Sequence, residues 1–223
     1  MNTLAILPAY NLEKSIESII EATMKFVDIV IVVSDGSSDM THEMALRTNA
    51  KCPPHTSNRG KGYALRKGIE FSKKFKPEYI VLIDADGQHL PDEIPLVLSP
   101  VIDEGYDMVI GSRMKGKLKT STVNKVGNFF LKLISFVVTG KWFTDTESGF
   151  RAFKASRLYS LDLEAVYYEI ESELLLKSLN NGFKIKEVPI TVPKAVPGVT
   201  VTDGIKMGIY KVKKGFQLKL RGN

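Results

Sequence analysis

Residues 79–88 read Tyr-Ile-Val-Leu-Ile-Asp-Ala-Asp-Gly-Gln. The first five are apolar or aromatic and largely β-branched, which is typical of a strand. The last five are small or polar and favour a turn. Because the run before Asp84 carries no polar side chain except the tyrosine hydroxyl, it predicts a strand covered on both faces, as in a parallel sheet.

The same order of a short apolar run and a longer amphipathic run repeats along the chain. We expect strands over 4–7, 29–33, 79–83 and 107–110. Helical patterns between and after them cover 13–25, 38–48, 61–74 and 92–103. The second half is less regular, with helices expected over 124–138 and 169–180 and short strands over 150–153 and 184–192. This alternation predicts an α/β fold with a mostly parallel central sheet and helices on both faces.

Composition sets the broad class. The chain has 223 residues, 43% hydrophobic and 25% charged, which fits one globular domain. Cys52 has no intrachain partner, so a reducing, cytoplasmic compartment is favoured. The net charge of +6 favours anionic partners. The most apolar stretch, 129–138, is about half of what a spanning helix needs, so we expect neither a transmembrane span nor a signal peptide.

Polar, turn-forming residues follow four expected strands, at 8–11, 34–39, 84–88 and 111–113. In a doubly wound sheet these ends face one crevice. Asp84 and Asp86 are two residues apart, which predicts that their carboxylates converge and repel unless a divalent cation binds. With Gln88 they form an all-oxygen set suited to Mg²⁺ or Mn²⁺ on a diphosphate. The alternative is a pair of solvated turn aspartates.

Two further segments favour a nucleotide ligand. Asp35 ends the second strand and either accepts hydrogen bonds from a ribose or base, or forms a turn with Gly36. The stretch 58–62, Asn-Arg-Gly-Lys-Gly, combines permissive glycines with two cations that suit phosphate. Its spacing is not that of a Walker A loop, and no G-x-G-x-x-G follows a strand, which argues against a dinucleotide oxidoreductase.

Together these segments resemble family-2 glycosyltransferases, in particular the dolichyl-phosphate mannose synthase branch. Seven motifs occur in order, at 7–11, 35–39, 58–62, 84–88, 111–113, 145–151 and 168–173. The resemblance implies a GT-A fold, a Rossmann-like three-layer sandwich. It also implies inverting, metal-dependent transfer of one sugar from a GDP- or UDP-linked donor to dolichyl or polyprenyl phosphate at the cytoplasmic membrane face.

The resemblance assigns roles to single residues. It implies a nucleotide-sugar site lined by Pro8, Tyr10, Glu13, Val33, Asp35, Lys61, Asp84 and Ala85. It implies a metal site of Asp84, Asp86 and Gln88, with Mg²⁺ or Mn²⁺ as cofactor. Catalysis would involve Asp86, Arg113 and Arg151, and the acceptor would contact Asp145, Glu173 and Lys194. Leu12 and Ser34 depart from the family pattern, and the sequence leaves the nucleobase and the sugar open.

The acceptor also has alternatives. A phosphate monoester is largely dianionic near neutral pH and attacks without a general base. A sugar hydroxyl would need a carboxylate base, for which Glu171 and Glu173 are the nearest options. A nucleotidyltransferase and a non-catalytic nucleotide-sugar-binding module also remain possible. We expect no nucleic-acid partner.

The C-terminal residues suggest a lipid surface. We expect residues 1–204 to form the GT-A domain and 205–223 a basic amphipathic helix. Between Ile205 and Arg221 there are basic residues and no acidic one. Four apolar residues share one helical stripe: Ile205, Ile209, Val212 and Phe216. The pattern predicts an interfacial helix on anionic lipid, with packing on the domain as the alternative.

Overall fold

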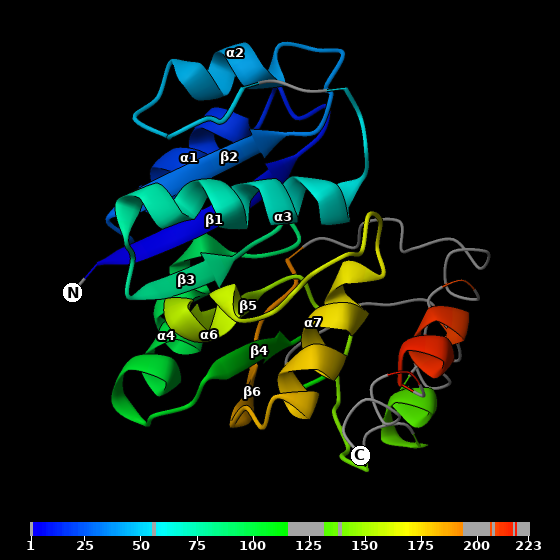
Figure 1. Cartoon of the computed structure of the whole chain (residues 1–223). Helices are drawn as coiled ribbons and strands as arrows, with labels where there is room; N and C mark the ends of the chain where they lie inside the picture. Colours follow the sequence, from blue (N-terminus) through cyan, green and yellow to red (C-terminus); the bar gives the residue numbers. More distant parts are fainter. Residues whose placement is uncertain are drawn as a thin grey trace.

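The computed structural model describes residues 2–54, 57–115, 132–137, 140–193, 206, 208–215 and 217. Its centre is a six-stranded sheet with the strand order β2-β1-β3-β5-β4-β6 (Figure 1). The strands are β1 (Thr3–Ala9), β2 (Ile29–Ser34), β3 (Tyr79–Leu82), β4 (Met108–Ser112), β5 (Arg151–Lys154) and β6 (Ile185–Pro189). All run parallel except β5, which is antiparallel to both of its neighbours, β3 and β4.

Helices cover both faces of this sheet. One face carries α1 (Ile16–Met24), α2 (Thr41–Leu46) and α4 (Ile94–Asp103), the last preceded by the 3₁₀ turn η2 (Pro91–Glu93). The other carries α3 (Lys61–Ser72), α6 (Ala155–Tyr159) and α7 (Ile170–Asn180), with the 3₁₀ turn η1 (Lys73–Phe75) ending α3. The predicted three-layer α/β sandwich is confirmed.

Side-chain alternation along β1 builds the two hydrophobic layers. Leu4 and Ile6 pack with α3 and α7, whereas Ala5 and Leu7 pack with α1 and α4. All four are fully buried. Two apolar layers therefore hold β1 in the middle of the sandwich. The polar segment that follows β1, beginning at Tyr10, consequently lies at the edge of the sheet.

The expected elements lie close to where the sequence placed them, with two additions. The five-residue helix α6 was not predicted, and neither was the antiparallel direction of β5. Of the helix expected over 124–138, residues 132–137 are described and are helical. The described part of the C-terminal segment, 206, 208–215 and 217, is helical too and lies beside 132–137 (Figure 1). Among the described helices, none combines the length and the apolarity that crossing a bilayer requires.

Candidate active site

The predicted site segments meet at one edge of the sheet. Because β1, β2, β3 and β4 run parallel, their carboxyl ends share that edge. The antiparallel β5 begins there as well, since Arg151 pairs with Leu82 of β3 and Ile110 of β4. The sheet thus brings the segments that follow β1, β2, β3 and β4 together with the segment that precedes β5.

A largely buried ion-pair cluster lies at the middle of this edge, with Lys61 and Asp84 half-buried and Glu171 and His89 buried. Lys61, the first residue of α3, places its Nζ 2.7 Å from Asp84 Oδ1 and 2.6 Å from Glu171 Oε1 in the first turn of α7. His89 Nε2 lies 3.6 Å from Asp84 Oδ2, and its ring packs against Phe150. One lysine therefore joins the ends of three elements, β3, α3 and α7.

The ion pairs set the protonation of this cluster. Burial disfavours the charged form of Asp84, but Lys61 and His89 more than offset it and hold the pKa of that carboxyl far below its usual range. Burial would likewise lower the pKa of Lys61, yet Asp84 and Glu171 raise it. Glu171 shares the lysine with Asp84, and burial together with that neighbouring charge raises its pKa. Asp84 is therefore the more acidic carboxyl of the two.

Asp86 and Gln88 are placed differently from Asp84. Asp86 is exposed, and its carboxylate accepts hydrogen bonds from the Gln88 backbone N–H at 3.0 Å and from Gln88 Nε2 at 2.7 Å. In the described part of the chain, no group of three His, Cys, Asp or Glu side chains could hold a metal ion. In the described residues, the carboxylates of Asp84 and Asp86 have different partners: Asp84 pairs with Lys61 and His89, and Asp86 accepts hydrogen bonds from Gln88.

Asp35 organises the loop before α3. Its two carboxylate oxygens accept the backbone N–H groups of Arg59 at 2.9 Å and Gly60 at 2.8 Å. Gly60 has φ +103°, and a Cβ there would lie 2.6 Å from the carbonyl oxygen of Val166, so glycine is required. Both functional and turn roles were open for Asp35, and the structure shows it supporting the loop that delivers Lys61.

Arg113 and Asp145 form the second ion pair of this edge. Arg113 donates from Nε at 2.7 Å and from Nη2 at 2.9 Å to the two oxygens of Asp145, a bidentate pair. Burial opposes ionisation of Asp145, but the guanidinium more than offsets it, so the pKa of the carboxyl is lowered. The Asp145 backbone N–H in turn donates to Glu187 at the end of the sheet. Arg113 keeps a fixed orientation with one nitrogen, Nη1, outside this pair.

Arg151 does not face a ligand cavity. It is fully buried and donates to three backbone carbonyls, those of Ser148, Glu171 and Thr146, at 2.7–2.8 Å. A direct catalytic contact, as the resemblance implied, does not fit this placement. The side chain instead ties the 145–150 loop to α7, because its charge needs buried acceptors once it is removed from water.

Glu173 also differs from its expected role. It is fully buried, accepts the backbone N–H of Ala165 at 2.8 Å, and pairs with Lys177 one turn along α7 at 2.9 Å. In the structure this carboxylate therefore supports the 164–165 segment and pairs with a cation of its own helix. Lys194, the other acceptor residue implied with it, lies outside the described residues.

The remaining residues of the predicted nucleotide-sugar site lie at or near the ends of β1, β2 and β3. Pro8 is half-buried and Tyr10 is exposed at the end of β1, whereas Val33 and Ala85 are buried in the two hydrophobic layers. Glu13 accepts the backbone N–H of Met40 at 3.2 Å and so joins the segment before α1 to the start of α2. Val33 and Ala85 shape the site through the core rather than by side-chain contact.

The 145–151 motif holds two further residues of this edge: Gly149, which the resemblance implies shapes the sugar and acceptor site, and Glu147, to which sequence reasoning gave no role. A Cβ on Gly149 would lie 2.2 Å from Asp84 Oδ2, so the loop backbone packs directly against that carboxylate. Glu147 is half-buried and pairs with Lys211 of the C-terminal helix at 2.5 Å. No spacing rule within the motif indicates a partner sixty residues downstream, and only the tertiary structure reveals it.

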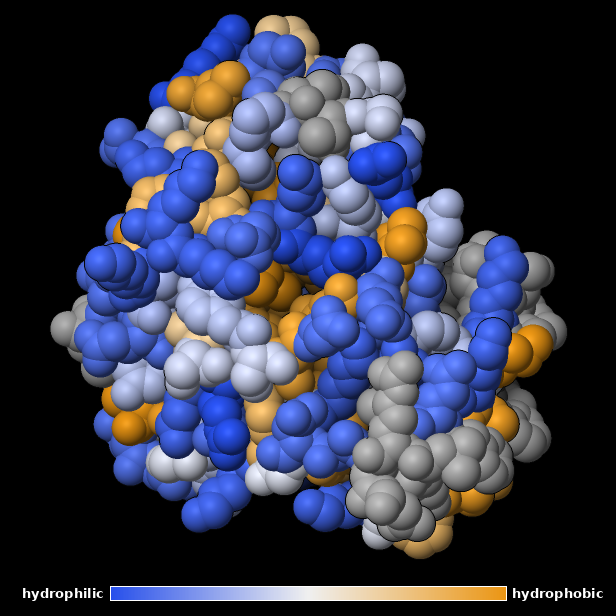
Figure 2. Space-filling model, viewed as in Figure 1, coloured by the Kyte–Doolittle hydropathy of each residue, from blue (hydrophilic) through white to orange (hydrophobic). Residues whose placement is uncertain are grey.

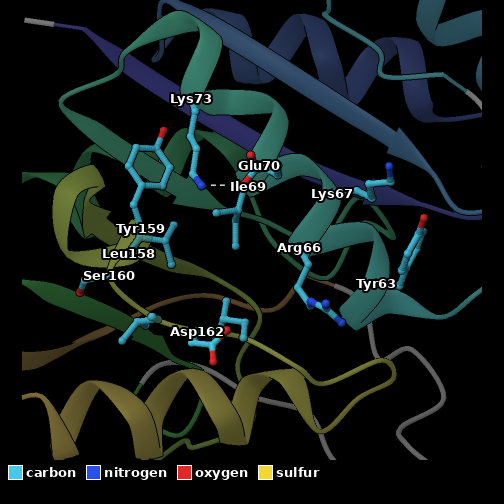
Figure 3. A pocket seen from close by; sticks show the side chains of 12 residues that line it. Tyr63, Arg66, Lys67, Ile69, Glu70, Lys73, Leu158, Tyr159, Ser160 and Asp162 are labelled. Carbon is cyan, nitrogen blue, oxygen red and sulfur yellow. Dashed lines mark hydrogen bonds and ion pairs between the residues drawn. The ribbon is translucent and has the colours of Figure 1, made fainter.

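A separate cleft of about 490 Å³ runs along the outer side of α3 (Figure 3). Tyr63 and Arg66 of α3 and Lys73 of η1 face the 158–163 segment across it. Lys73 pairs with Glu70 inside this cleft at 2.6 Å. None of its described lining residues belongs to the predicted site, so we treat it as distinct from the cluster around Asp84.

Comparisons with known proteins agree with this arrangement. A family model described as glycosyl transferase family 2 matches residues 5–161. The UDP-N-acetylglucosamine–dolichyl-phosphate N-acetylglucosaminyltransferase of Methanococcus voltae is 34% identical over 208 residues, which cover 83% of this chain and 83% of that protein. The polyprenol monophosphomannose synthase of Mycolicibacterium smegmatis is 30% identical over 234 residues, covering 94% of this chain and 85% of the relative.

The fold has solved counterparts. The crystal structure of glucosyl-3-phosphoglycerate synthase from Mycobacterium tuberculosis in complex with Mn²⁺, uridine diphosphate and phosphoglyceric acid superposes with a TM-score of 0.75. It is 22% identical, and the match covers 96% of this chain and 77% of that one, so it speaks for the fold alone. With the family match and the relatives, it leads to one conclusion: the chain belongs to glycosyl transferase family 2 and is a glycosyltransferase of GT-A fold.

Proposed function

We propose that this glycosyltransferase moves one sugar from a UDP- or GDP-linked donor to dolichyl or polyprenyl phosphate, with inversion at the anomeric carbon, at the cytoplasmic face of a membrane. A phosphate oxygen of the acceptor attacks the anomeric carbon while the bond to the nucleoside diphosphate breaks. The acceptor loses no proton that a base must take, because it is already largely dianionic near neutral pH.

One observation carries the choice of a phosphate acceptor. The two carboxylates that could serve a hydroxyl acceptor as a base are both engaged: Glu173 is fully buried on backbone N–H groups, and Glu171 is paired with Lys61. A general base must reach the proton that it removes. Both relatives named above carry a polyprenyl-type phosphate in their names, which supports the same choice.

The cationic residues match two anionic reactants. Lys61, held next to Asp84 by the loop that Asp35 orders, is suited to the donor diphosphate. Arg113, oriented by its bidentate pair with Asp145, is suited to the acceptor phosphate. Positioning two negative groups against each other is the main barrier of this reaction, and preorganised cations lower it.

A divalent cation fits this edge only together with the donor. Asp86 is exposed with Gln88 beside it, and Mg²⁺ in such sites is commonly held by one or two carboxylates, substrate phosphates and water. Asp86, Gln88 and Asp84 would hold Mg²⁺ or Mn²⁺. When bound, the ion would neutralise charge on the leaving diphosphate.

An anionic lipid surface is the proposed location. Six large apolar side chains are exposed near the C-terminal helix and 132–142: Leu133, Phe136, Val137, Trp142, Ile209 and Val212. Lys206 and Lys213 are exposed on the same helix. Figure 2 shows hydrophobic surface on this side of the molecule, interspersed with hydrophilic residues. Apolar side chains flanked by lysines are typical of interfacial binding to anionic lipid.

A donor screen tests the proposal. Release of nucleoside diphosphate is measured for UDP- and GDP-linked sugars, with and without polyprenyl phosphate, and the anomeric configuration of the product is read by NMR. Release that depends on the lipid phosphate, with inverted product, supports the proposal. Release only with sugar acceptors, or release of pyrophosphate instead, would exclude it.

Asp86 provides the matched variant pair for the metal. Asp86→Asn should weaken Mn²⁺-dependent donor binding and lower turnover by about 100-fold or more, on the scale of losing charge stabilisation in a transition state. Asp92→Asn removes an exposed carboxylate from η2 and should do neither. Unchanged metal dependence in Asp86→Asn would remove this residue from the metal site.

A further inference from the structure

Lys211 is the unusual residue of the C-terminal helix. Its side chain is fully buried although its neighbours Ile209 and Val212 are 64% and 41% exposed. At about 100° per residue, Lys211 lies about 160° from Ile209 and about 100° from Val212 around the helix axis, so the ammonium points away from the apolar stripe. A buried lysine is tolerated only where partners compensate its charge. Among its described residues, the helix thus turns Lys211 inward and Ile209 and Val212 outward.

The partners of Lys211 come from two other segments. Its Nζ lies 2.5 Å from Glu147 Oε1 and donates to Thr146 Oγ1 at 2.9 Å, both in the 145–150 loop. It also donates to Ser135 Oγ at 2.9 Å, in helix 132–137. Burial opposes ionisation of Glu147, but Lys211 more than offsets it and lowers the pKa of that carboxyl. One ammonium therefore joins both lipid-facing helices to a single loop.

That loop touches both charged clusters of the active site. Asp145 holds Arg113, and the Gly149 backbone packs against Asp84. Glu147 also accepts a hydrogen bond from Ser172 Oγ at 3.3 Å, and the residue before Ser172 is the Lys61 partner Glu171. Through Lys211, a displacement of the C-terminal helix would act directly on this loop.

We propose that Lys211 is a positioning residue that ties the lipid-facing helices to the 145–150 loop, so that docking on a lipid surface fixes the acceptor side of the active site. The inference rests on the proposed function, because it assigns the acceptor to that loop and a lipid surface to the exposed faces of the two helices. Lys211 contacts no substrate in this scheme.

Hydrogen exchange of the full-length protein tests the link without any substrate. Vesicles of phosphatidylcholine and phosphatidylglycerol should slow amide exchange in 145–150 by about tenfold in the wild-type protein. Lys211→Met should still bind these vesicles but show no such protection. Lys213→Met, which removes an exposed lysine from the same helix, should retain it. Equal protection in wild type and Lys211→Met would overturn the inference.

Kinetics provide the second readout. Lys211→Met should raise KM for polyprenyl phosphate by about tenfold and KM for the donor by much less, because Lys211 contacts Thr146 and Glu147 beside Asp145, whereas Gly149 packs against Asp84 nearer the other end of the loop. Parallel increases in both constants would indicate a general structural defect and overturn the inference. If Lys211→Met does not fold, the double variant Lys211→Met with Glu147→Gln leaves no unpaired buried charge and should show the same two losses.

The two proposals fail separately. Absence of transfer to polyprenyl phosphate by the wild-type protein would refute the proposed function, and the acceptor role of the loop with it. Transfer by the wild type with no change in Lys211→Met would refute the inference alone. In either case the exchange measurement still shows whether the helices and the loop are coupled.

Discussion

Gly149 and Asp84 are in direct contact, although 65 residues separate them in the chain. A Cβ built on Gly149 would lie 2.2 Å from Asp84 Oδ2 and 2.7 Å from its Cγ. Real Cβ atoms do not approach other atoms so closely, and therefore any side chain at this position must displace the Asp84 carboxylate. The glycine permits the loop to hold that carboxylate against Lys61.

Gly149→Ala should therefore impair the reaction more than the fold. The added methyl group pushes Asp84 away from Lys61 and from the donor site, and a misplacement of about 1 Å can cost roughly 100-fold in rate. We expect kcat/KM for the donor to fall by about 10- to 100-fold. Steady-state kinetics together with thermal unfolding will check both parts.

Gly68→Ala is the matched control. Its added methyl would lie 2.4 Å from Ile6 Cγ2, in the hydrophobic layer beneath α3 and away from the carboxylates. This variant should lose stability by overpacking, about 1–3 kcal/mol, while the remaining folded protein turns over normally. Equal kinetic losses in Gly68→Ala and Gly149→Ala would mean that contact with Asp84 is not the cause.

Asp107 at the start of β4 supplies a pH-dependent part of the stability. The carboxylate lies 3.2 Å from Arg157 Nε and 3.3 Å from Lys154 Nζ, and accepts the Lys184 backbone N–H at 3.0 Å. Burial raises the pKa of this group, but the hydrogen bond from Arg157 and the other partners outweigh it, so the pKa is lowered. A lowered carboxyl pKa stabilises the fold above the unfolded value, about 3.9, and this contribution is lost as pH falls through the folded value.

Asp107→Asn should thus be less stable than wild type at pH 7, by about 1–3 kcal/mol for the buried hydrogen bonds that it weakens. The margin should begin to narrow as the pH is lowered below about 5, because Asp107 takes up a proton in the unfolded state before it does so in the folded state. Urea unfolding of both proteins at a series of pH values measures this difference in the free energy of unfolding. Asp92→Asn, which removes an exposed carboxylate, serves as the control. If the stability difference between Asp107→Asn and wild type varies with pH no more than that of the control, Asp107 does not supply a pH-dependent part of the stability.

Most of the fold follows from local sequence patterns. The runs 29–33 and 79–83 are apolar on both faces, and both form strands with helices on either face of the sheet, β3 inside the sheet and β2 at its edge. The direction of strand β5 was harder to predict, because its four residues, Arg-Ala-Phe-Lys, do not indicate whether it runs parallel or antiparallel to its neighbours. Its antiparallel insertion between β3 and β4 depends on the long connection from 113 to 150, and length alone does not specify a path.

The sequence predicted where the site lies in the fold, but not which side chains contact one another there. Turn residues after the strands located the edge, since parallel strands share their carboxyl ends. Residue type could not separate Arg113, which is partly exposed in a bidentate pair, from Arg151, which is sealed under the loop. Burial decides between these two arginines, and burial depends on segments that pack over them from elsewhere in the chain.

The exposed stripe of the C-terminal helix should govern vesicle binding. Replacing Ile209 and Val212 together by serine removes apolar surface that is exposed in the free protein. Apolar burial is worth about 1.5–3 kcal/mol for a fully buried aliphatic side chain, so even partial insertion predicts a loss of about tenfold or more in vesicle affinity. Turnover on a short-chain acceptor dispersed in detergent should remain.

A control pair tests whether position or apolarity matters. Leu46 and Leu96 are also exposed, on α2 and α4, and serine at both should leave vesicle binding unchanged. Sedimentation with anionic vesicles measures all variants. If both pairs weaken binding equally, the protein adsorbs without a defined orientation and the proposed lipid-facing surface is wrong.

Glu173→Gln separates a catalytic base from a structural carboxylate. The group accepts backbone N–H groups of the 164–165 segment and pairs with Lys177, and no part of its side chain is exposed. Glutamine keeps one acceptor oxygen but turns a donor toward an N–H, so stability should fall by about 1–3 kcal/mol. Turnover per folded molecule should stay close to wild type. Loss of a general base would instead lower kcat by about 100-fold or more while binding of the donor persists, and that outcome would return a hydroxyl acceptor to consideration.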